Sequence, residues 1–362
     1  MPSLAQQLQS DDCRYCSVVS KSAGEDPIGT AMTADQWLII EVPRPWSDSP
    51  WSNKPELESL LQVFESVERD RNLYDKLRIL AIAPDKRQSK PGYSHVFHYR
   101  RPARLFARYQ LELYCLPTEQ VGSLAQALFF DRVSLVRFDG YRLGGDRRDV
   151  LVCTHTQVDL ACGRFGMPLY KSLQRDYATD QTHIWQASHF GGHKFAPTLI
   201  DFPSGRFWGH LEAQHLKPLM TQTGDRKMLR SCYRGWSGLE HWGQVAEREL
   251  WQSEGWAWFQ HPKAGRVVQR ELGSWKLKWV RSLLKLIPTR RARDLISRID
   301  QKTIWAIVQI SAATAVDQPE KQYYFKTEVS YNVLTQGNSG VNAAKKHFPQ
   351  YRSTPLKQGS SI

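Results

Sequence analysis

Short apolar runs separated by polar and turn residues organise the first 140 positions of the chain. Residues 37–42 (Trp-Leu-Ile-Ile-Glu-Val) predict a buried strand, and the apolar residues between Leu57 and Phe64 recur at helical spacing. A charged stretch with several glycines at 137–148 indicates a boundary after these elements. Between them we expect strands at 78–83, 95–99 and 105–114 and a helix from Thr118 to about Phe129.

A second set of elements repeats this order. Residues 150–153 predict a short buried strand, 166–177 a helix, 182–187 another strand, and 198–202 with 207–211 a hairpin. In open α/β sheets, functional groups gather beyond the carboxyl ends of the strands, so the residues that follow the first two of these strands are of most interest. We therefore expect an α/β fold with two thioredoxin-like units in series, of which only the second keeps functional residues.

The last third of the chain has a different pattern. Residues 303–310 and 322–333 alternate like two strands, and the chain turns polar after Gly337. These patterns predict an α+β extension of the two units and a flexible end. The expected parts are a degenerate N-terminal unit at 1–140, a unit with the candidate ligands at 148–225, a basic C-terminal extension at 226–336 and a flexible tail at 337–362.

Composition is that of a globular protein in a reducing compartment. The chain has 362 residues, 41% of them hydrophobic, which is enough for about two domains with real cores. Six cysteines are too few for a disulfide framework. No run approaches the roughly 18 apolar residues of a membrane span, and the first residues lack the features of a secretory signal. We therefore expect a cytoplasmic protein.

Two thiols and two imidazoles are gathered in two short segments of the second unit. Eight residues separate Cys153 from Cys162, and three separate His189 from His193. Such a set suits zinc, and it also suits a 2Fe-2S cluster in which one iron has two Cys ligands and the other has two His ligands. The wide cysteine spacing favours the cluster over the tight knuckle that is usual in zinc modules, but composition leaves both open.

Several segments around these positions form a recognisable set. They are Cys16–Ser20, Gly24-Glu25, Gly29–Ala31, Trp37-Leu38, Glu41–Trp46, Val152–His155, Asp159, Cys162-Gly163, Gly166, Pro168 and, most specifically, Ser188-His-Phe-Gly-Gly-His-Lys-Phe-Ala-Pro-Thr198. From residue 13 to about 250 the chain resembles the sucrase/ferredoxin-like family. This resemblance implies that the second unit is a thioredoxin-like ferredoxin, an electron-transfer protein with a 2Fe-2S cluster. Its ligands in this sequence would be Cys153, Cys162, His189 and His193.

Neighbouring residues extend the candidate site. Gly191 and Gly192 would let the loop approach a cluster closely, and Lys194 could stabilise its negative charge or remain a solvated surface charge. Imidazole ligands make a cluster less negative than thiolates do, and their far nitrogens can hold protons, so electron transfer could be coupled to proton transfer. We interpret His155 as a neighbour of the site or a surface residue rather than a ligand.

Two other functions are compatible with the cysteines and histidines of the sequence. A zinc-stabilised interaction protein would use the same four residues, and a dithiol oxidoreductase would use Cys13 and Cys16, which have thioredoxin-type spacing but precede any clear strand. The sequence contains no phosphate loop, dinucleotide fingerprint or His-Glu-x-x-His pair. No segment singles out the two carboxylates that glycoside hydrolysis needs. We therefore expect an electron carrier rather than a sucrase.

Positive charge is concentrated in one C-terminal segment. The net charge is +13, and between Glu271 and Arg298 eight basic residues stand against two acidic ones. Interleaved Trp and Leu residues predict a basic amphipathic helix that ends before Pro288. Residues 275–298 could then bind an acidic redox partner or an anionic membrane, or pack against the domain with a solvated basic face. Specific nucleic-acid binding is not expected, because no recognition module is present. The basic residues are Lys276, Lys278, Arg281, Lys285, Arg290, Arg291, Arg293 and Arg298.

Overall fold

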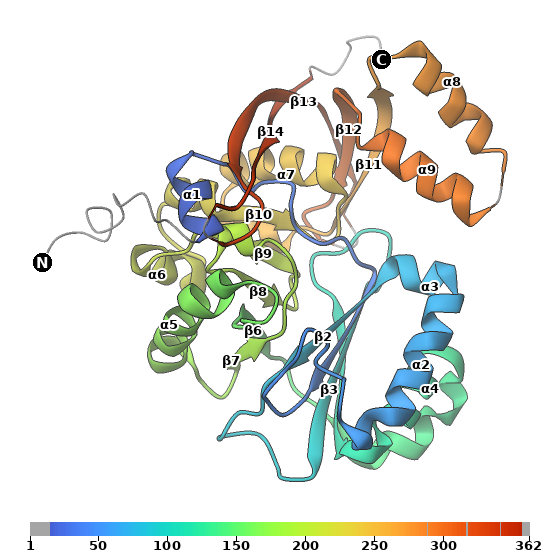
Figure 1. Cartoon of the computed structure of the whole chain (residues 1–362), viewed down its shortest axis with the longest axis vertical. Helices are drawn as coiled ribbons and strands as arrows, with labels where there is room; N and C mark the ends of the chain where they lie inside the picture. The colour runs from blue at the N-terminus through green and yellow to red at the C-terminus, as the bar shows by residue number, and fades with distance from the viewer. Residues whose placement is uncertain (1–14, 288, 316–317, 341, 357–362) are drawn as a thin grey trace, which may run out of the picture.

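The computed structural model describes residues 15–287, 289–315, 318–340 and 342–356, apart from the side chains of residues 290, 293 and 297. Its strands form a ten-stranded mixed sheet and a four-stranded antiparallel sheet (Figure 1), which confirms the expected mixed α/β class. The large sheet has the order β10-β9-β8-β6-β7-β2-β1-β3-β4-β5. Its strands are β1 (Gln36–Glu41), β2 (Leu77–Ile82), β3 (Tyr93–Arg100), β4 (Gln110–Pro117), β5 (Arg142–Leu143), β6 (Arg148–Cys153), β7 (Thr182–Ala187), β8 (Leu199–Phe202), β9 (Arg206–Trp208) and β10 (Tyr233–Trp236).

The large sheet consists of two halves with the same connectivity. In the first half β1 pairs in parallel with β2 and antiparallel with β3, and β3 continues to β4. In the second half β6 pairs in parallel with β7 and antiparallel with β8, and β8 continues to β9. The halves meet at a single pair, Ile82 with Ala187. The register places Glu41, Ile82, Ala187 and Cys153 in one row across the sheet.

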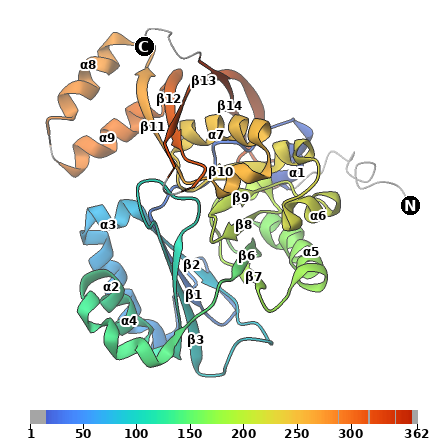
Figure 2. The same cartoon turned by 180° about the vertical axis from the view of Figure 1, so that it is seen from behind.

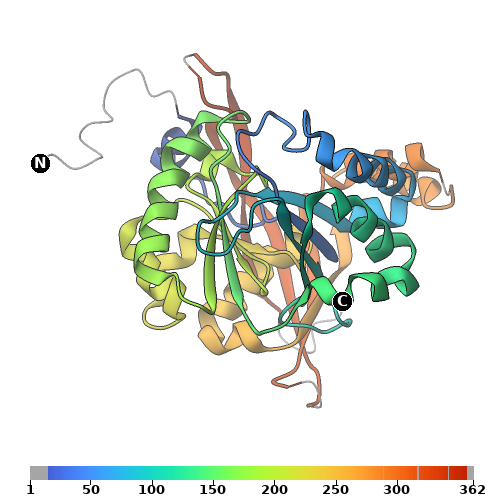
Figure 3. The same ribbon diagram turned by 90° about the horizontal axis from the view of Figure 1, so that it is seen from below.

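A shared aromatic core lies between the two halves. Trp37 and Tyr99 of the first half contact Phe202 of the second half, with ring centroids 5.4 and 4.4 Å away. The helices lie on the outer sides, as Figure 3 shows from below. Because aromatic side chains bury large apolar areas, this core holds the two halves together although they share only one strand pair.

The outer helices connect the parallel strands of each half. In the first half α2 (Glu58–Arg69) and α3 (Arg71–Lys76) lead to β2, and α4 (Val121–Phe130) packs beside α2. In the second half α5 (Leu160–Tyr177) leads to β7, and α6 (Ala213–Thr221) lies beside it. Helix α5 begins before the expected start at 166 because the Asp159 carboxylate caps it, accepting a hydrogen bond from the Ala161 N–H at 2.8 Å.

Short 3-10 segments complete the connections. They are η1 (Pro55–Leu57), η2 (Thr118–Gln120), η3 (Arg132–Tyr141), η4 (His193–Phe195), η5 (Arg226–Cys232) and η6 (Trp256–Gln260). The strand expected at 105–114 begins later, at Gln110, because Phe106 forms an isolated bridge with Lys263 instead. Among the residues described, none of the helices combines the length and apolar character that crossing a bilayer requires.

The C-terminal third forms the second sheet. Its strands are β11 (Lys263–Glu271), β12 (Trp305–Ala312), β13 (Lys321–Gln336) and β14 (Lys345–Pro355), and α7 (His241–Glu254) packs against them. The two strands predicted in this region, at 303–310 and 322–333, are confirmed as β12 and β13.

The expected parts differ from the structure in three places. The tail at 337–362 was predicted to be flexible, but its residues 345–355 form β14, which pairs along β13 and packs Tyr351 against the ring of His241. The segment 226–336 is not wholly an extension, because β10 joins the large sheet. Helix α1 (Cys16–Ser22), assigned to the N-terminal unit, instead contacts η4 and β13.

Two basic helices leave the second sheet between β11 and β12. Helices α8 (Trp275–Leu284) and α9 (Arg290–Asp300) pack against each other and stand out from the body of the molecule, as Figure 2 shows from behind. The sequence predicts a helix that continues to the residue before Pro288, whereas α8 ends at Leu284, three residues before Ile287. We call these two helices the α8–α9 hairpin.

Candidate metal centre

Three of the four predicted ligands converge at the carboxyl ends of β6 and β7. Cys153 is the last residue of β6, Cys162 lies in the first turn of α5, and His189 follows β7. The Nδ1 atom of His189 lies 3.8 Å from the Cys153 sulfur and 3.6 Å from the Cys162 sulfur. Both cysteines are buried, and all three donor atoms lie within 4.8 Å of one another. This arrangement can hold a metal.

The fourth predicted ligand lies next to this group but faces another one. The ring centroids of His189 and His193 are 5.5 Å apart. However, Nδ1 of His193 lies 3.2 Å from the Asp159 carboxylate and 3.4 Å from the Cys16 sulfur. Cys16, Asp159 and His193 thus form a second group of donor atoms within 4.8 Å of one another. Sequence reasoning had assigned no such role to Cys16 or Asp159.

The loop between β13 and β14 reaches the second group. The Ser339 N–H donates to one Asp159 oxygen at 2.8 Å, and its hydroxyl donates to the other at 2.6 Å. The Ser339 hydroxyl also lies 3.4 Å from the Cys16 sulfur. No sequence signal pointed to Ser339, because its partners are far away along the chain.

Charge in the first group is shared unequally between the two cysteines. Burial favours the neutral thiol of Cys153, but hydrogen bonds from Cys162 and His189 outweigh it and lower the Cys153 pKa. Hydrogen bonding to Cys153 and burial raise the pKa of Cys162. The pair therefore favours one thiolate and one thiol, and a metal would have to displace the remaining proton.

The second group places a carboxylate beside a neutral thiol. Burial raises the pKa of Cys16 to about 12. Burial acts in the same direction on Asp159, but hydrogen bonds from His193, Ser339 and Ala161 outweigh it and lower the Asp159 pKa. Asp159 is therefore an anion that can hold the proton of a histidine ring nitrogen, as carboxylates do beside metal-binding histidines.

Arg234 is a buried cation beneath the loop that carries both histidines. Its guanidinium donates to the Gly191 carbonyl at 3.0 Å and to the Thr30 carbonyl at 2.7 Å. Burial lowers the pKa of Arg234 to about 10, although the charges of Cys153 and Cys162 act in the opposite direction. The side chain therefore keeps a positive charge close to the cysteine pair. Sequence reasoning assigned no role to Arg234, because nothing in its local sequence shows that it lies beneath this loop.

The two glycines of the loop have left-handed backbones and different surroundings. Gly191 and Gly192 have φ angles of 79° and 77°. A Cβ atom on Gly192 would lie 2.4 Å from the guanidinium carbon of Arg234, whereas one on Gly191 would meet nothing within 4 Å. Gly192 is therefore needed for both its conformation and the close approach of Arg234.

His155 and Lys194 contact the site from outside. The His155 ring accepts from the His189 backbone N–H at 3.4 Å and donates through Nε2 to the Ser47 carbonyl at 2.7 Å. Lys194 forms an ion pair with Glu25 and lies 3.2 Å from the ring centroid of Phe348. Its charge is thus engaged on the Cys16 side, away from the cysteine pair.

The remaining cysteines lie elsewhere. Cys13 falls outside the described residues, so a dithiol with Cys16 stays a prediction. Cys115 is half-buried in β4, and Cys232 is buried with its sulfur 3.6 Å from Nδ1 of His215. Burial raises the pKa of Cys232 to about 12, as expected for a packed thiol without a catalytic role.

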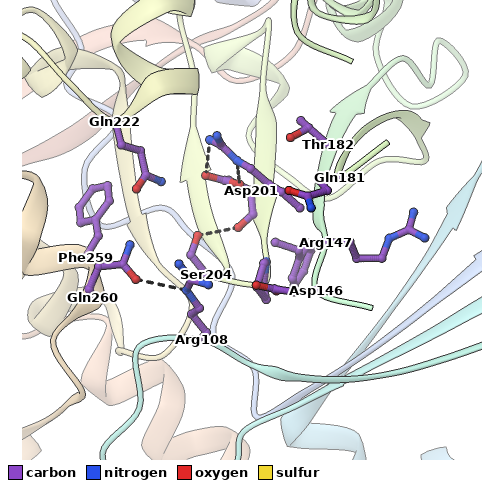
Figure 4. Close-up of a pocket in the computed structure, with 13 residues that line it drawn as sticks. Arg108, Asp146, Arg147, Gln181, Thr182, Asp201, Ser204, Gln222, Phe259 and Gln260 are labelled. Carbon is purple, nitrogen blue, oxygen red and sulfur yellow. Dashed lines mark hydrogen bonds and ion pairs between the residues drawn. The ribbon is translucent and has the colours of Figure 1, made fainter. Parts of the chain in front are cut away.

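A polar pocket of about 190 Å³ opens at the other end of the large sheet (Figure 4). Arg148 makes two hydrogen bonds to the Asp201 carboxylate, at 2.8 and 2.9 Å, and Arg108 donates to Gln260 at 3.2 Å. Arg147 is paired with Asp149. Two of these three cations are paired with carboxylates, whereas the partner of Arg108 is a neutral amide. The described residues that line the pocket include no cysteine or histidine, so the candidate metal chemistry stays with the group at the other end of the sheet.

Comparisons with known proteins cover the same region. The family model described as "Sucrase/ferredoxin-like" matches residues 27–235, which include all four predicted ligands and Arg234. The chain is 28% identical over 92 residues to "Altered inheritance of mitochondria protein 32" of Clavispora lusitaniae, covering 24% of this chain and 34% of the relative. It is 23% identical over 141 residues to the protein of that name from Debaryomyces hansenii, covering 34% of this chain and 51% of the relative. These matches span about half of the curated relatives or less. No solved structure matches the chain.

Proposed function

Because the chain belongs to the sucrase/ferredoxin-like family, we propose that it is an electron-transfer protein that holds a 2Fe-2S cluster through Cys153, Cys162, His189 and His193. The observation that carries this proposal is the convergence of Cys153, Cys162 and His189 at two neighbouring strand ends, with His193 beside them. A bound cluster would accept and release single electrons. The protein's own residues would supply the ligands, the charge balance and the protection from water.

The donor set and its surroundings fit such a cofactor. Two thiols and two imidazoles are the ligand types that a mixed Cys–His cluster takes. Both cysteines are buried, which would keep water from the sulfur ligands, while both histidines are only partly buried and could face a redox partner. The positive charge of Arg234 would offset the negative charge of the thiolates.

The surroundings of His193 support a proton-handling role. If the Nδ1–H of His193 donates to Asp159, then Nε2 is left free as the ligand atom. His189 instead presents Nδ1 to the cysteines. Asp159 would therefore fix the ring orientation of His193 and hold a proton on its far nitrogen, as coupling of electron and proton transfer requires.

We further propose that both halves of the large sheet are thioredoxin-like units and that only the second keeps ligands. The shared strand order and the single pair between the halves support this proposal. The partner in electron transfer would be an acidic protein that approaches the partly buried histidines, since the chain carries a strong positive net charge.

The test is the composition and colour of protein purified without oxygen. We expect a red-brown protein with about two irons and two sulfides per chain. Absorption spectra, iron and sulfide assays and zinc analysis on the same sample would measure this. Colourless protein with one zinc and no sulfide, from cells grown with ample iron, contradicts the proposal.

A single zinc ion is the second candidate, and the distances in the first group favour it specifically. In a tetrahedral zinc site with bonds of about 2.3 Å to sulfur and about 2.05 Å to nitrogen, sulfur and nitrogen ligands lie about 3.6 Å apart. The observed separations of 3.6 and 3.8 Å are close to this value. The protein would then be a zinc-stabilised interaction protein, which the same metal analysis distinguishes.

A further inference from the structure

The α8–α9 hairpin exposes an unusually large apolar surface. Helix α8 has no buried residue. Trp275, Trp279 and Leu286 are 71%, 66% and 79% exposed, and Leu283 lies between them. Trp275, Trp279 and Leu283 recur every four residues and so lie on one side of α8, and Leu286 follows in the turn after the helix. The prediction that residues 275–287 might serve only to pack against the domain does not fit this exposure, because the apolar side chains face outward.

Cations surround this apolar surface. Lys276, Lys285, Arg291 and Arg298 are exposed, and the described part of the chain gives none of them an acidic partner. Two other cations of the hairpin have acidic partners within the protein. Lys278 pairs with Glu271, and Arg281 makes two hydrogen bonds to Asp300 at the end of α9. The free cations are therefore available to bind an anion outside the protein.

The hairpin is fixed in place on the protein. Arg71 of α3 donates to the Asp294 carboxylate of α9 at 2.6 Å, and Ala292 and Ile299 are buried. In Figures 1 and 3, α8 lies on the opposite side of the molecule from α1 and α5, which flank the candidate metal centre. Binding through the hairpin would thus leave the side of the molecule with the candidate metal centre uncovered.

We propose that the α8–α9 hairpin binds the surface of an anionic lipid bilayer. Trp275, Trp279, Leu283 and Leu286 enter the boundary between headgroups and acyl chains, where tryptophan is favoured. Lys276, Lys285, Arg291 and Arg298 bind the lipid phosphates and the negative surface potential. The proposal does not depend on the identity of the bound metal.

The shape of the surface favours a bilayer over an acidic protein. Protein interfaces bury aromatic anchors in matching pockets of the partner. Here α8 stands out from the body of the molecule (Figure 2) and has no buried residue, and the exposed cations beside its apolar side chains carry the opposite charge to an anionic headgroup layer. A fluid bilayer accommodates such a ridge without a preformed pocket, as it does with other amphipathic helices.

The test is sedimentation of the full-length protein with vesicles. One set contains phosphatidylcholine alone, and the other contains phosphatidylcholine with 30 mol % phosphatidylglycerol, about the anionic content of a strongly charged leaflet. We expect binding to the anionic vesicles only, weakened at high salt. Trp275→Ser with Trp279→Ser should lower the affinity about tenfold or more, and Lys276→Glu with Lys285→Glu should do so to a similar extent.

Matched controls separate the hairpin from general surface properties. Val133→Ser with Val136→Ser removes exposed apolar residues of η3, and Lys86→Glu with Arg87→Glu makes the same charge change in another loop. Both controls should bind the anionic vesicles like the unmodified protein. No binding to anionic vesicles, or equal losses in the hairpin and control variants, overturns the proposal. Binding to soluble polyglutamate that equals vesicle binding and ignores the two tryptophans overturns it in favour of an acidic protein partner.

Discussion

Glu41 and Cys153 occupy the same place in the two halves of the large sheet, and they have opposite surroundings. Each is the last residue of the inner strand that pairs in parallel with the next, and both lie in one row across the sheet. Glu41 is buried beside His95, whose Nδ1 lies 2.6 Å from its carboxylate. Cys153 meets Cys162 and His189 instead.

The residue that follows the second parallel strand also differs between the two halves. Two residues after β7 comes His189, whereas Pro84, which has no titratable group, stands two residues after β2. Both halves contain closed pairs of buried polar groups, such as His98 with Glu112 at 3.0 Å in the first half and Arg148 with Asp201 in the second. Among the residues that the structure describes, only the second half also gathers two thiols and an imidazole at the ends of its parallel strands. One strand order can thus serve as a stable support or as a site, depending on a few residues at the strand ends.

The largest effect is expected when a cysteine is removed from each half, which tests whether only the second half binds metal. Cys153→Ala or Cys162→Ala should reduce bound metal from full occupancy to nearly none, because each removes a predicted ligand from the first group. Cys115→Ala in β4 is the matched control and should leave the metal content unchanged. Metal analysis of the purified variants measures both effects. Full retention of metal after loss of Cys153 would show that this group is not the binding site.

Replacing the two loop glycines separately would sharpen the picture of the second half. Gly192→Ala combines a left-handed backbone with a clash against Arg234, so we expect it to lower the free energy of unfolding by about 3 kcal/mol. Gly191→Ala has the same backbone but open space, and about 1 kcal/mol is expected. Urea unfolding measures both values. Equal losses would mean that Arg234 moves away at no cost.

The last prediction concerns a buried pair of the first half, and its expected effect is smaller than that of Gly192→Ala. Burial favours the neutral form of Glu112, but hydrogen bonds from His98 and Arg132 outweigh it and lower its pKa to about 2. The pKa of Glu112 in the folded protein is depressed. Its contribution to the free energy of unfolding is therefore complete above the unfolded pKa of about 4.3 and is lost as the pH falls towards 2. Glu112→Gln should therefore be less stable than the unmodified protein by about 2 kcal/mol at neutral pH. The difference should shrink below about pH 4. A difference that is independent of pH, in urea unfolding, would contradict this assignment.

Local patterns predicted the parts of the site that depend on chain neighbours. Apolar runs placed Cys153 and His189 after two strands, and parallel pairing of those strands brings them together. The spacing of the thiols and imidazoles also pointed to Cys162 and His193, the resemblance implied the same four residues, and the family is confirmed. The 2Fe-2S cluster, the set of four ligands, the acidic partner and the cytoplasmic location stay predictions.

Contacts between distant residues could not be predicted in this way. Sequence reasoning assigned no role to Arg234, Asp159 or Ser339, because their contacts depend on how the two sheets pack. The end of the chain was misjudged for the same reason. Its polar sequence suggests a loose tail, but the edge of β13 offers backbone partners along which residues 345–355 pair.

The contact of Cys16 with Ser339 also orders events during synthesis. These residues are 323 positions apart, yet the Cys16 N–H donates to the Ser339 hydroxyl at 3.1 Å. A ribosome makes Cys153, Cys162 and His189 long before Ser339, so the first donor group can assemble while Asp159 still lacks its late partner. Metal could then enter a half-finished protein. Ser339 is made later and would join Asp159 and Cys16 only after the first donor group has formed.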